Sequence, residues 1–215
     1  WRDEDGKILA MPDDWGLAVQ FRDVNGDGAP DLYVCNDFLT PDRFWLNDGT
    51  GYFQLISPLA LRHTSRFSMG VDFADINRDG RDDFFTVDML SRDHTRRKQQ
   101  MGGMLPTPVA IGTISNRPQI MQNTLFLNRG DGTYAESAML ARVKGSEWAW
   151  SPMLMDVDLD GYEDLLVTTG MTRDYMDADT GNKMAVLQGL SLEEEKRSRL
   201  LYPRLATANV IFRNR

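Results

Sequence analysis

The chain contains the stretch Asp23-Val-Asn-Gly-Asp-Gly-Ala-Pro-Asp31 and repeats its pattern twice further on. The later copies are Asp75-Ile-Asn-Arg-Asp-Gly-Arg-Asp-Asp83 and Asp156-Val-Asp-Leu-Asp-Gly-Tyr-Glu-Asp164. All three fit Asp-x-Asn/Asp-x-Asp-Gly-x-x-Asp. A period of tens of residues is typical of solenoids and propellers, so the repeat predicts an architecture of similar stacked units.

The flanks of the three stretches also repeat, as short apolar segments bounded by turn residues. The segments before the stretches are Gly16 to Phe21, Met69 to Ala74 and Pro152 to Met155, and those after them are Leu32 to Val34, Phe84 to Val87 and Leu165 to Val167. Their length and their rich content of Val, Leu and Phe predict β-strands. Each Asp-rich stretch is therefore expected to be the loop between two strands.

A second motif repeats downstream of each loop. The segment Arg43 to Phe53 is echoed by Thr124 to Tyr134, and both contain Leu-Asn, a Gly-rich turn and an aromatic residue. A third copy begins at Asn209 and ends with the sequence. The motif predicts a β-hairpin, which gives each unit four strands, the content of one propeller blade.

The predicted fold class is all-β, a partial β-propeller of about three four-stranded repeats that fills residues 1–215. Repeat 1 covers about 15–67, repeat 2 about 68–148 and a truncated repeat 3 about 149–215. Repeats 2 and 3 carry mostly helical or irregular insertions, 90–122 and 171–208. A closed propeller needs at least about four blades, so we expect further blades in a larger protein.

Two helices are expected inside the insertions. Ser191 and Glu194 fit a capping box for a helix that runs to about Leu201 and stops before Pro203. The segment from Ser91 to Met101 is basic and is compatible with a second helix. Trp15, Trp45, Trp148, Trp150 and the Phe84–Phe85 pair are expected to pack between the blades.

The composition excludes several kinds of site. The 32 acidic and 24 basic residues give a formal net charge of −8, which disfavours nucleic acid as a partner. The sequence has no apolar run of about 18 residues, the length that would indicate a membrane span. Cys35, His63 and His94 offer too few ligands for a zinc cluster. The remaining candidates for a bound ligand are metal ions that prefer oxygen ligands.

The spacing of the acidic residues favours such an ion. Side chains at positions 1, 3 and 5 of a tightly curled loop can converge, and Gly at position 6 permits the curl. An EF-hand needs an acidic residue at position 12, where Val34, Thr86 and Val167 stand. The plainer alternative is an Asp- and Gly-rich turn without metal, but three loops in register, each with several carboxylates that repel one another, favour calcium.

The loops and hairpins together resemble the FG-GAP or VCBS repeat family, whose blades follow the integrin α-subunit propeller. More narrowly, the chain resembles bacterial proteins that pair such repeats with an ASPIC/UnbV segment. The resemblance implies that loop positions 1, 3, 5 and 9 bind about three Ca²⁺ ions. These ligands would be Asp23, Asn25, Asp27, Asp31, Asp75, Asn77, Asp79, Asp83, Asp156, Asp158, Asp160 and Asp164.

Three functions are compatible with these features. The first is a binding module, not an enzyme, of an extracellular, cell-surface or periplasmic protein, with calcium as a structural element. The second is the propeller portion of a carbohydrate-active hydrolase or lyase, for which Arg173, Asp174, Tyr175, Asp177 and Asp179 are the polar cluster to examine. The third is an assembly unit that holds a separate domain in place.

The order of the strands predicts where a partner binds. In an antiparallel blade successive connections alternate between its two ends, so the Asp loops and the hairpin turns share one face. The insertions 90–122 and 171–208 then lie on the opposite face. We expect a protein or glycan partner there, remote from the calcium ions.

Overall fold

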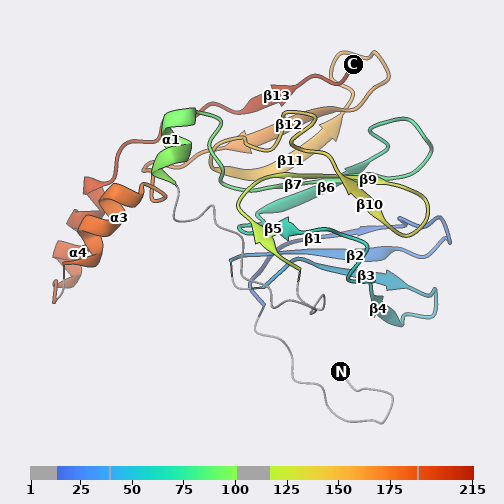
Figure 1. Ribbon diagram of the computed structural model, residues 1–215, viewed down its shortest axis with the longest axis horizontal. Helices are drawn as coiled ribbons and strands as arrows, with labels where there is room; N and C mark the ends of the chain where they lie inside the picture. Colours follow the sequence, from blue (N-terminus) through green and yellow to red (C-terminus); the bar gives the residue numbers. More distant parts are fainter. Residues whose placement is uncertain (1–13, 39, 101–116, 188) are drawn as a thin grey trace, which may run out of the picture.

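The structure is a computed structural model, and it describes residues 14–38, 40–100, 117–187 and 189–215. Its strands form three antiparallel sheets that lie side by side (Figure 1). Sheet 1 contains β1 (Gly16–Arg22), β2 (Asp31–Asn36), β3 (Arg43–Asn47) and β4 (Phe53–Leu55), in that order. Neighbouring strands in the sheet are also consecutive in sequence, as the expected blade topology requires.

Sheets 2 and 3 repeat this order. Sheet 2 contains β6 (Gly70–Ala74), β7 (Asp83–Val87), β9 (Thr124–Asn128) and β10 (Tyr134–Glu136), and sheet 3 contains β11 (Ala149–Met155), β12 (Asp164–Thr169) and β13 (Val210–Phe212). A small parallel pair, β5 (Thr64–Ser65) with β8 (Gln119–Ile120), was not expected from the sequence. The mainly antiparallel β architecture is confirmed, with four strands in sheets 1 and 2 and three in sheet 3.

The hydrophobic core lies between the sheets. Adjacent residues of a strand point to opposite faces, so Phe84 and Phe85 enter different cores. Phe84 packs between sheets 1 and 2, with its ring centroid 4.9 Å from that of Tyr33 and 4.8 Å from that of Phe126. Phe85 packs between sheets 2 and 3 with Val167. Both Phe side chains are fully buried, which confirms that this pair fills the spaces between the sheets.

Two of the tryptophans do not pack between the described sheets. Trp15 is 56% exposed and Trp150 is 45% exposed. Trp15 lies just before β1, whose outward face is not covered by any of the described strands. Trp150 lies at the irregularity where the pairing of β11 with β12 shifts register, and its indole N–H donates to the carbonyl oxygen of Gly170 at 2.7 Å.

Sheets 2 and 3 approach most closely at Gly70. A Cβ atom at this position would lie 2.9 Å from the carbonyl oxygen of Trp150 and 3.0 Å from the side chain of Pro152. Only glycine fits such a contact without a backbone shift. The first strands of neighbouring sheets are therefore packed backbone against backbone.

The helices lie together at one end of the sheets, opposite the Asp loops (Figure 1). They are α1 (His94–Gln99), α3 (Ala178–Ala185) and α4 (Leu192–Ser198), which continues as the 3-10 helix η1 (Arg199–Leu201). The capping box of Ser191 and Glu194 is present, as predicted, whereas α3 was not expected. Residues 101–116 of the first insertion lie outside the described residues. In the described ranges, no helix has the length and apolar character needed to cross a membrane.

Candidate metal centres

Each Asp-rich stretch connects the first two strands of its sheet, and we call the stretches loop 1 (23–31), loop 2 (75–83) and loop 3 (156–164). The carboxylate at position 1 organises the curl by accepting backbone N–H groups. Asp23 Oδ1 accepts from Gly26 at 2.8 Å, and its Oδ2 accepts from Gly28 at 2.9 Å. Asp23 Oδ1 also accepts from Asp27, at position 5, at 3.2 Å. Asp75 and Asp156 likewise accept from the N–H groups of positions 5 and 6. The loops therefore share one backbone conformation.

Two positions of each loop adopt the left-handed region of backbone conformation. Position 6 is the expected glycine, with φ of 86° at Gly28, 83° at Gly80 and 88° at Gly161. Position 4 is left-handed as well, and sequence reasoning missed it. Loop 1 has Gly26 there, but Arg78 and Leu159 occupy it at φ of 60° in the other two loops. A non-glycine residue costs about 1–2 kcal/mol in this conformation, so loops 2 and 3 carry backbone strain.

The curl brings the side chains of positions 1, 3 and 5 together. In loop 3, carboxylate oxygens of Asp156, Asp158 and Asp160 all lie within 4.8 Å of one another. In loop 1 the position 3 residue is Asn25, whose Nδ2 donates to Asp27 Oδ2 at 2.8 Å. Loop 2 repeats this contact between Asn77 and Asp79 at 3.1 Å. The structure thus groups nine of the twelve predicted ligands at three centres.

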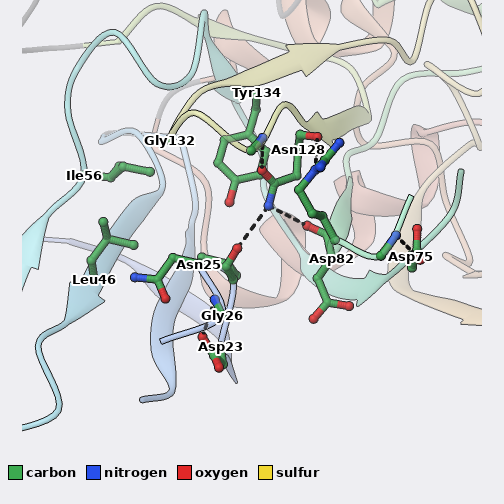
Figure 2. Close-up of a pocket in the computed structure, with 14 residues that line it drawn as sticks. Asp23, Asn25, Gly26, Leu46, Ile56, Asp75, Asp82, Asn128, Gly132 and Tyr134 are labelled. Atoms are coloured by element: carbon green, nitrogen blue, oxygen red, sulfur yellow. Dashed lines mark hydrogen bonds between the residues drawn. The ribbon is translucent and has the colours of Figure 1, made fainter. Parts of the chain in front are cut away.

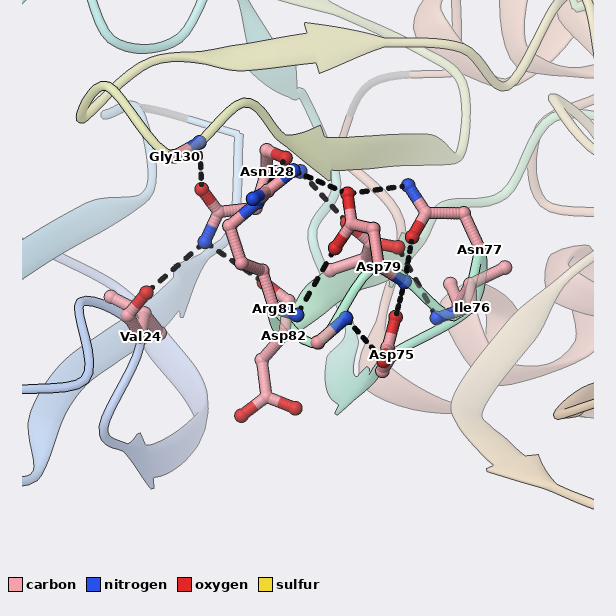
Figure 3. Close-up of polar contacts among 11 residues, drawn as sticks. Val24, Asp75, Ile76, Asn77, Asp79, Arg81, Asp82, Asn128 and Gly130 are labelled. Atoms are coloured by element: carbon pink, nitrogen blue, oxygen red, sulfur yellow. Dashed lines mark hydrogen bonds and ion pairs between the residues drawn. The ribbon is translucent and has the colours of Figure 1, made fainter.

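Positive side chains approach two of these centres. Arg213 lies 2.5 Å from Asp158 and 3.2 Å from Asp160, measured between nitrogen and carboxylate oxygen. In loop 2, Arg81 lies 2.7 Å from Asp79 by the same measure (Figure 3). Both arginine side chains are about half exposed, at 49% and 44%. The pKa of Asp160 is held below its ordinary value by the backbone N–H of Tyr162 and by Arg213. Half-exposed guanidinium groups therefore lie against the acidic groups of loops 2 and 3.

The aspartates at position 9 lie beneath the centres and are buried. Asp31 Oδ2 accepts the backbone N–H of Val24 at 3.0 Å, and its Oδ1 accepts that of Asn47 at 2.8 Å. Asp83 and Asp164 make the equivalent pair of bonds. Burial raises the pKa of Asp31, and it raises the pKa of Asp83 to about 6. A carboxylate has about four acceptor sites, so two remain beside the N–H bonds.

The predicted ligand atoms suit a hard cation. Calcium takes six to eight oxygen ligands from carboxylates, amides, backbone carbonyls and water. Positions 1, 3 and 5 supply only carboxylate and amide oxygens here, and no thiol or imidazole is among the predicted ligands. The backbone N–H of position 7 donates to the position 5 carboxylate in every loop, so the position 7 residue also lies beside the group.

A cleft of about 440 Å³ separates loop 1 from loop 2 (Figure 2). Asp23, Asn25 and Asp75 line it from the loops, and Asn128 and Tyr134 line it from the hairpin of sheet 2. Asn128 belongs to a set that sequence reasoning did not assign to the site, the asparagines at or just after the ends of the third strands. The set is Asn47, Asn128 and Asn214. The repeated Leu-Asn of the hairpin motif was the available signal for Asn47 and Asn128, whereas Arg213 precedes Asn214.

Three residues of the polar cluster singled out for a carbohydrate-active enzyme make local structural contacts. Asp177 caps α3, since its carboxylate accepts the backbone N–H of Thr180 at 2.7 Å. Asp174 is buried and accepts the backbone N–H of Met176 at 3.3 Å. Arg173 donates to the carbonyl oxygen of Tyr202 at 2.9 Å. These contacts fold the second insertion onto itself.

Comparison with known proteins identifies the repeat. A search of curated proteins found no match to this chain. The family model described as "FG-GAP-like repeat" matches residues 12–86 and 109–167, which together include all three Asp loops and more than half of the chain. The narrower resemblance to proteins with an ASPIC/UnbV segment stays a prediction. The chain belongs to the FG-GAP-like repeat family.

Proposed function

We propose that this chain is a calcium-stabilised segment of a β-propeller that serves as an interaction scaffold, not as an enzyme. The observation that carries the proposal is the common construction of the three loops. Each loop wraps its backbone around the position 1 carboxylate, and in loop 3 the carboxylate oxygens of positions 1, 3 and 5 lie within 4.8 Å of one another. Three such centres, one beside each sheet, are better suited to stabilising a fold than to a single catalytic event.

Calcium would be held by the twelve predicted residues, with position 9 using the acceptor sites that its N–H donors leave free. The ion would supply positive charge to carboxylates that otherwise repel one another. Three Ca²⁺ ions carry six positive charges, so a formal net charge of −8 would become about −2. Extracellular modules use weak sites with Kd of about 10⁻⁴ to 10⁻³ M, which supports an extracellular, cell-surface or periplasmic location.

The exposed apolar faces of sheets 1 and 3 support the proposal that the chain is part of a propeller. Val71 and Phe73 of β6 pack toward sheet 1, and the residues at the same positions of β1 are Val19 and Phe21. Val19 is 60% exposed and Phe21 is 57% exposed. On the other side, Ile211 of sheet 3 is 57% exposed. Both faces therefore have the apolar character of the interfaces between the sheets, and we propose that further blades cover them.

The scaffold role rests on the insertions, for which we propose a protein or glycan partner. The insertion that carries α3 and α4 exposes large apolar side chains at the end of the molecule remote from the Asp loops (Figure 1). The most exposed are Val186, Leu192, Leu200 and Leu201. Exposed apolar side chains gathered on one segment are typical of interaction surfaces. Calcium would then maintain the shape of the sheets without contacting the partner.

Thermal unfolding with and without calcium tests the proposal. Ligand that binds only the folded state adds about 2.7 kcal/mol at a hundredfold excess over Kd. EDTA should therefore lower the Tm, and Ca²⁺ should restore it more effectively than Mg²⁺, which demands a smaller octahedral shell. The matched control is the triple variant Asp27→Ala, Asp79→Ala, Asp160→Ala, whose Tm should not respond to either addition. Identical melting curves of the unmodified chain in EDTA and in calcium would contradict the proposal.

A further inference from the structure

The side chain of Asn128 joins two Asp loops that lie far apart in the sequence. Its Nδ2 donates to the carbonyl oxygen of Val24 in loop 1 at 3.0 Å, across 104 residues (Figure 3). Its backbone N–H donates to Asp83 Oδ1 in loop 2 at 2.8 Å. The orientation of the side-chain amide is fixed by the N–H of Gly130, which donates to Asn128 Oδ1 at 2.9 Å. One residue of sheet 2 is thus bonded to both loops.

The next pair of sheets repeats the arrangement. Asn214 Nδ2 donates to the carbonyl oxygen of Ile76 in loop 2 at 2.8 Å, and its backbone N–H donates to Asp164 Oδ1 in loop 3 at 2.9 Å. Val24 and Ile76 are both position 2 of their loops. The hydrogen bonds therefore form a directed series, in which the asparagine of one sheet reaches the loop of the sheet before it.

Position 2 is where such a bond affects ligand geometry. Its residue stands between the predicted ligands of positions 1 and 3, and its own N–H is already bonded to the position 9 carboxylate. Val24 is buried, so without the amide of Asn128 its carbonyl group would lose its partner within the protein. The peptide that carries Asn25 is in this way oriented by sheet 2.

We propose that Asn128 and Asn214 are positioning residues that couple the calcium loops of successive sheets. Asn128 shapes loop 1 and Asn214 shapes loop 2, although neither is a calcium ligand. The part of this inference that concerns calcium rests on the proposed function. The loops share no ligand, and on that ground alone they would be independent of one another. The coupling makes the order of each loop depend on the sheet that follows it.

Two further contacts act in the same direction along the series. Arg22, just before loop 1, forms an ion pair with Asp82 of loop 2. Arg78 of loop 2 lies over the ring of Tyr162 in loop 3, with 4.5 Å from the guanidinium carbon to the ring centroid. Both contacts are on the surface, where such interactions contribute little. The buried asparagine bonds are therefore the ones to change.

Hydrogen exchange of the loop amides tests the inference with and without calcium. In Asn128→Ala the backbone N–H groups of Gly26, Asp27 and Gly28 should exchange faster, while the amides of loop 3 keep their wild-type rates as an internal reference. In Asn214→Ala the effect should move to loop 2. Asn128→Asp keeps the acceptor for Gly130 but lacks the donor to Val24. It should show the same faster exchange in loop 1 as Asn128→Ala, and it replaces that variant in the test if the alanine variant folds poorly.

A calcium titration of single loops gives the second readout. In the background Asp79→Ala, Asp160→Ala only loop 1 remains intact, and adding Asn128→Ala should raise its Kd roughly threefold to tenfold, the equivalent of one hydrogen bond. In the background Asp27→Ala, Asp79→Ala, which keeps loop 3, the same change should leave Kd unaltered. Equal effects on loops 1 and 3, or no effect on loop 1, would overturn the inference. If the unmodified chain bound no calcium, the proposed function would fail, and the exchange rates alone would decide the coupling.

Discussion

Asp83 Oδ1 accepts the backbone N–H of Asn128 at 2.8 Å, although the two residues are 45 positions apart. The other oxygen of Asp83 accepts the N–H of Ile76 at 3.2 Å. The last aspartate of the loop thus clamps the loop to the third strand of its sheet. The same clamp joins Asp31 to Asn47 and Asp164 to Asn214. Position 9 therefore has a structural role in addition to its predicted role as a ligand.

Replacing Asp83 with alanine should therefore destabilise the metal-free chain. The change leaves the buried N–H of Asn128 without an acceptor, and it removes one of two bonds of the N–H of Ile76, which also donates to the carbonyl oxygen of Ala74 at 3.0 Å. An unsatisfied buried N–H group costs about 1–3 kcal/mol, and loss of an ordinary hydrogen bond costs about 0.5–1.5 kcal/mol. We expect the free energy of unfolding in EDTA to fall by roughly 1.5–4.5 kcal/mol, measured by urea denaturation. Asp82→Ala is the matched control, because Asp82 forms only a surface ion pair with Arg22 and its loss should cost less than about 1 kcal/mol. Equal losses of unfolding free energy in the two variants would contradict the role of Asp83 in joining loop 2 to the third strand.

The strands and the Asp loops were predictable because they depend on local patterns. Apolar segments between turn residues located the first two strands of each sheet to within one to three residues, as at β6 and β12. The asparagine contacts were not predictable, because the bond from Asn128 to Val24 exists only once two sheets have packed. The helix α3 was missed because its sequence, which includes Gly181 and Thr180, has little helix propensity and depends on the Asp177 cap.

Removing one ligand should empty one centre. Asp79 provides the position 5 carboxylate of loop 2, and no other loop uses it. We expect Asp79→Ala to lower the calcium stoichiometry from about three to about two in a calorimetric titration. The affinities of the remaining centres should shift only modestly, since the predicted ligands of one loop are not shared with another. Loss of all binding in this variant would show that the centres form one cooperative unit.

The strain at position 4 of loop 3 can be relieved. Leu159 has φ of 60° and is 86% exposed, so its side chain contributes almost no burial. Glycine adopts this conformation freely, and its greater unfolded-state entropy offsets part of the gain. We expect Leu159→Gly to stabilise the chain by about 0.5–1 kcal/mol in thermal or urea unfolding. Arg78→Gly should gain less, because Arg78 also stacks on Tyr162. Destabilisation by Leu159→Gly would contradict the claim that the backbone at Leu159 is strained.

A buried carboxyl group on the insertion side of sheet 1 makes stability depend on pH. Asp42 Oδ1 accepts the backbone N–H of Asn36 at 2.9 Å, and its Oδ2 accepts from the hydroxyls of Tyr33 and Ser68. In sheets 2 and 3 the equivalent acceptors are the side-chain oxygens of Asn123 and Asn209, which accept the backbone N–H groups of Asp88 and Thr169. Complete burial raises the pKa of Asp42 to about 7, with a further contribution from the charge of Asp88. Sheet 1 thus has an ionisable group where the other sheets have a neutral amide.

Asp42→Asn should remove this pH dependence. A carboxyl group whose pKa is raised on folding binds its proton more tightly in the folded chain, so its contribution to stability is fully present below the unfolded pKa of about 3.8 and is lost as pH rises through about 7. The amide of the variant does not titrate. In EDTA, the free energy of unfolding of the variant relative to that of the wild type should therefore rise between pH 4 and pH 8, by at most roughly 4 kcal/mol.

Urea denaturation at pH 4, 6 and 8 measures this difference, and Asp48→Asn, at the exposed hairpin turn, is the control that should not reproduce it. Parallel pH profiles for Asp42→Asn and the wild type would show that Asp42 stays ionised in the folded chain.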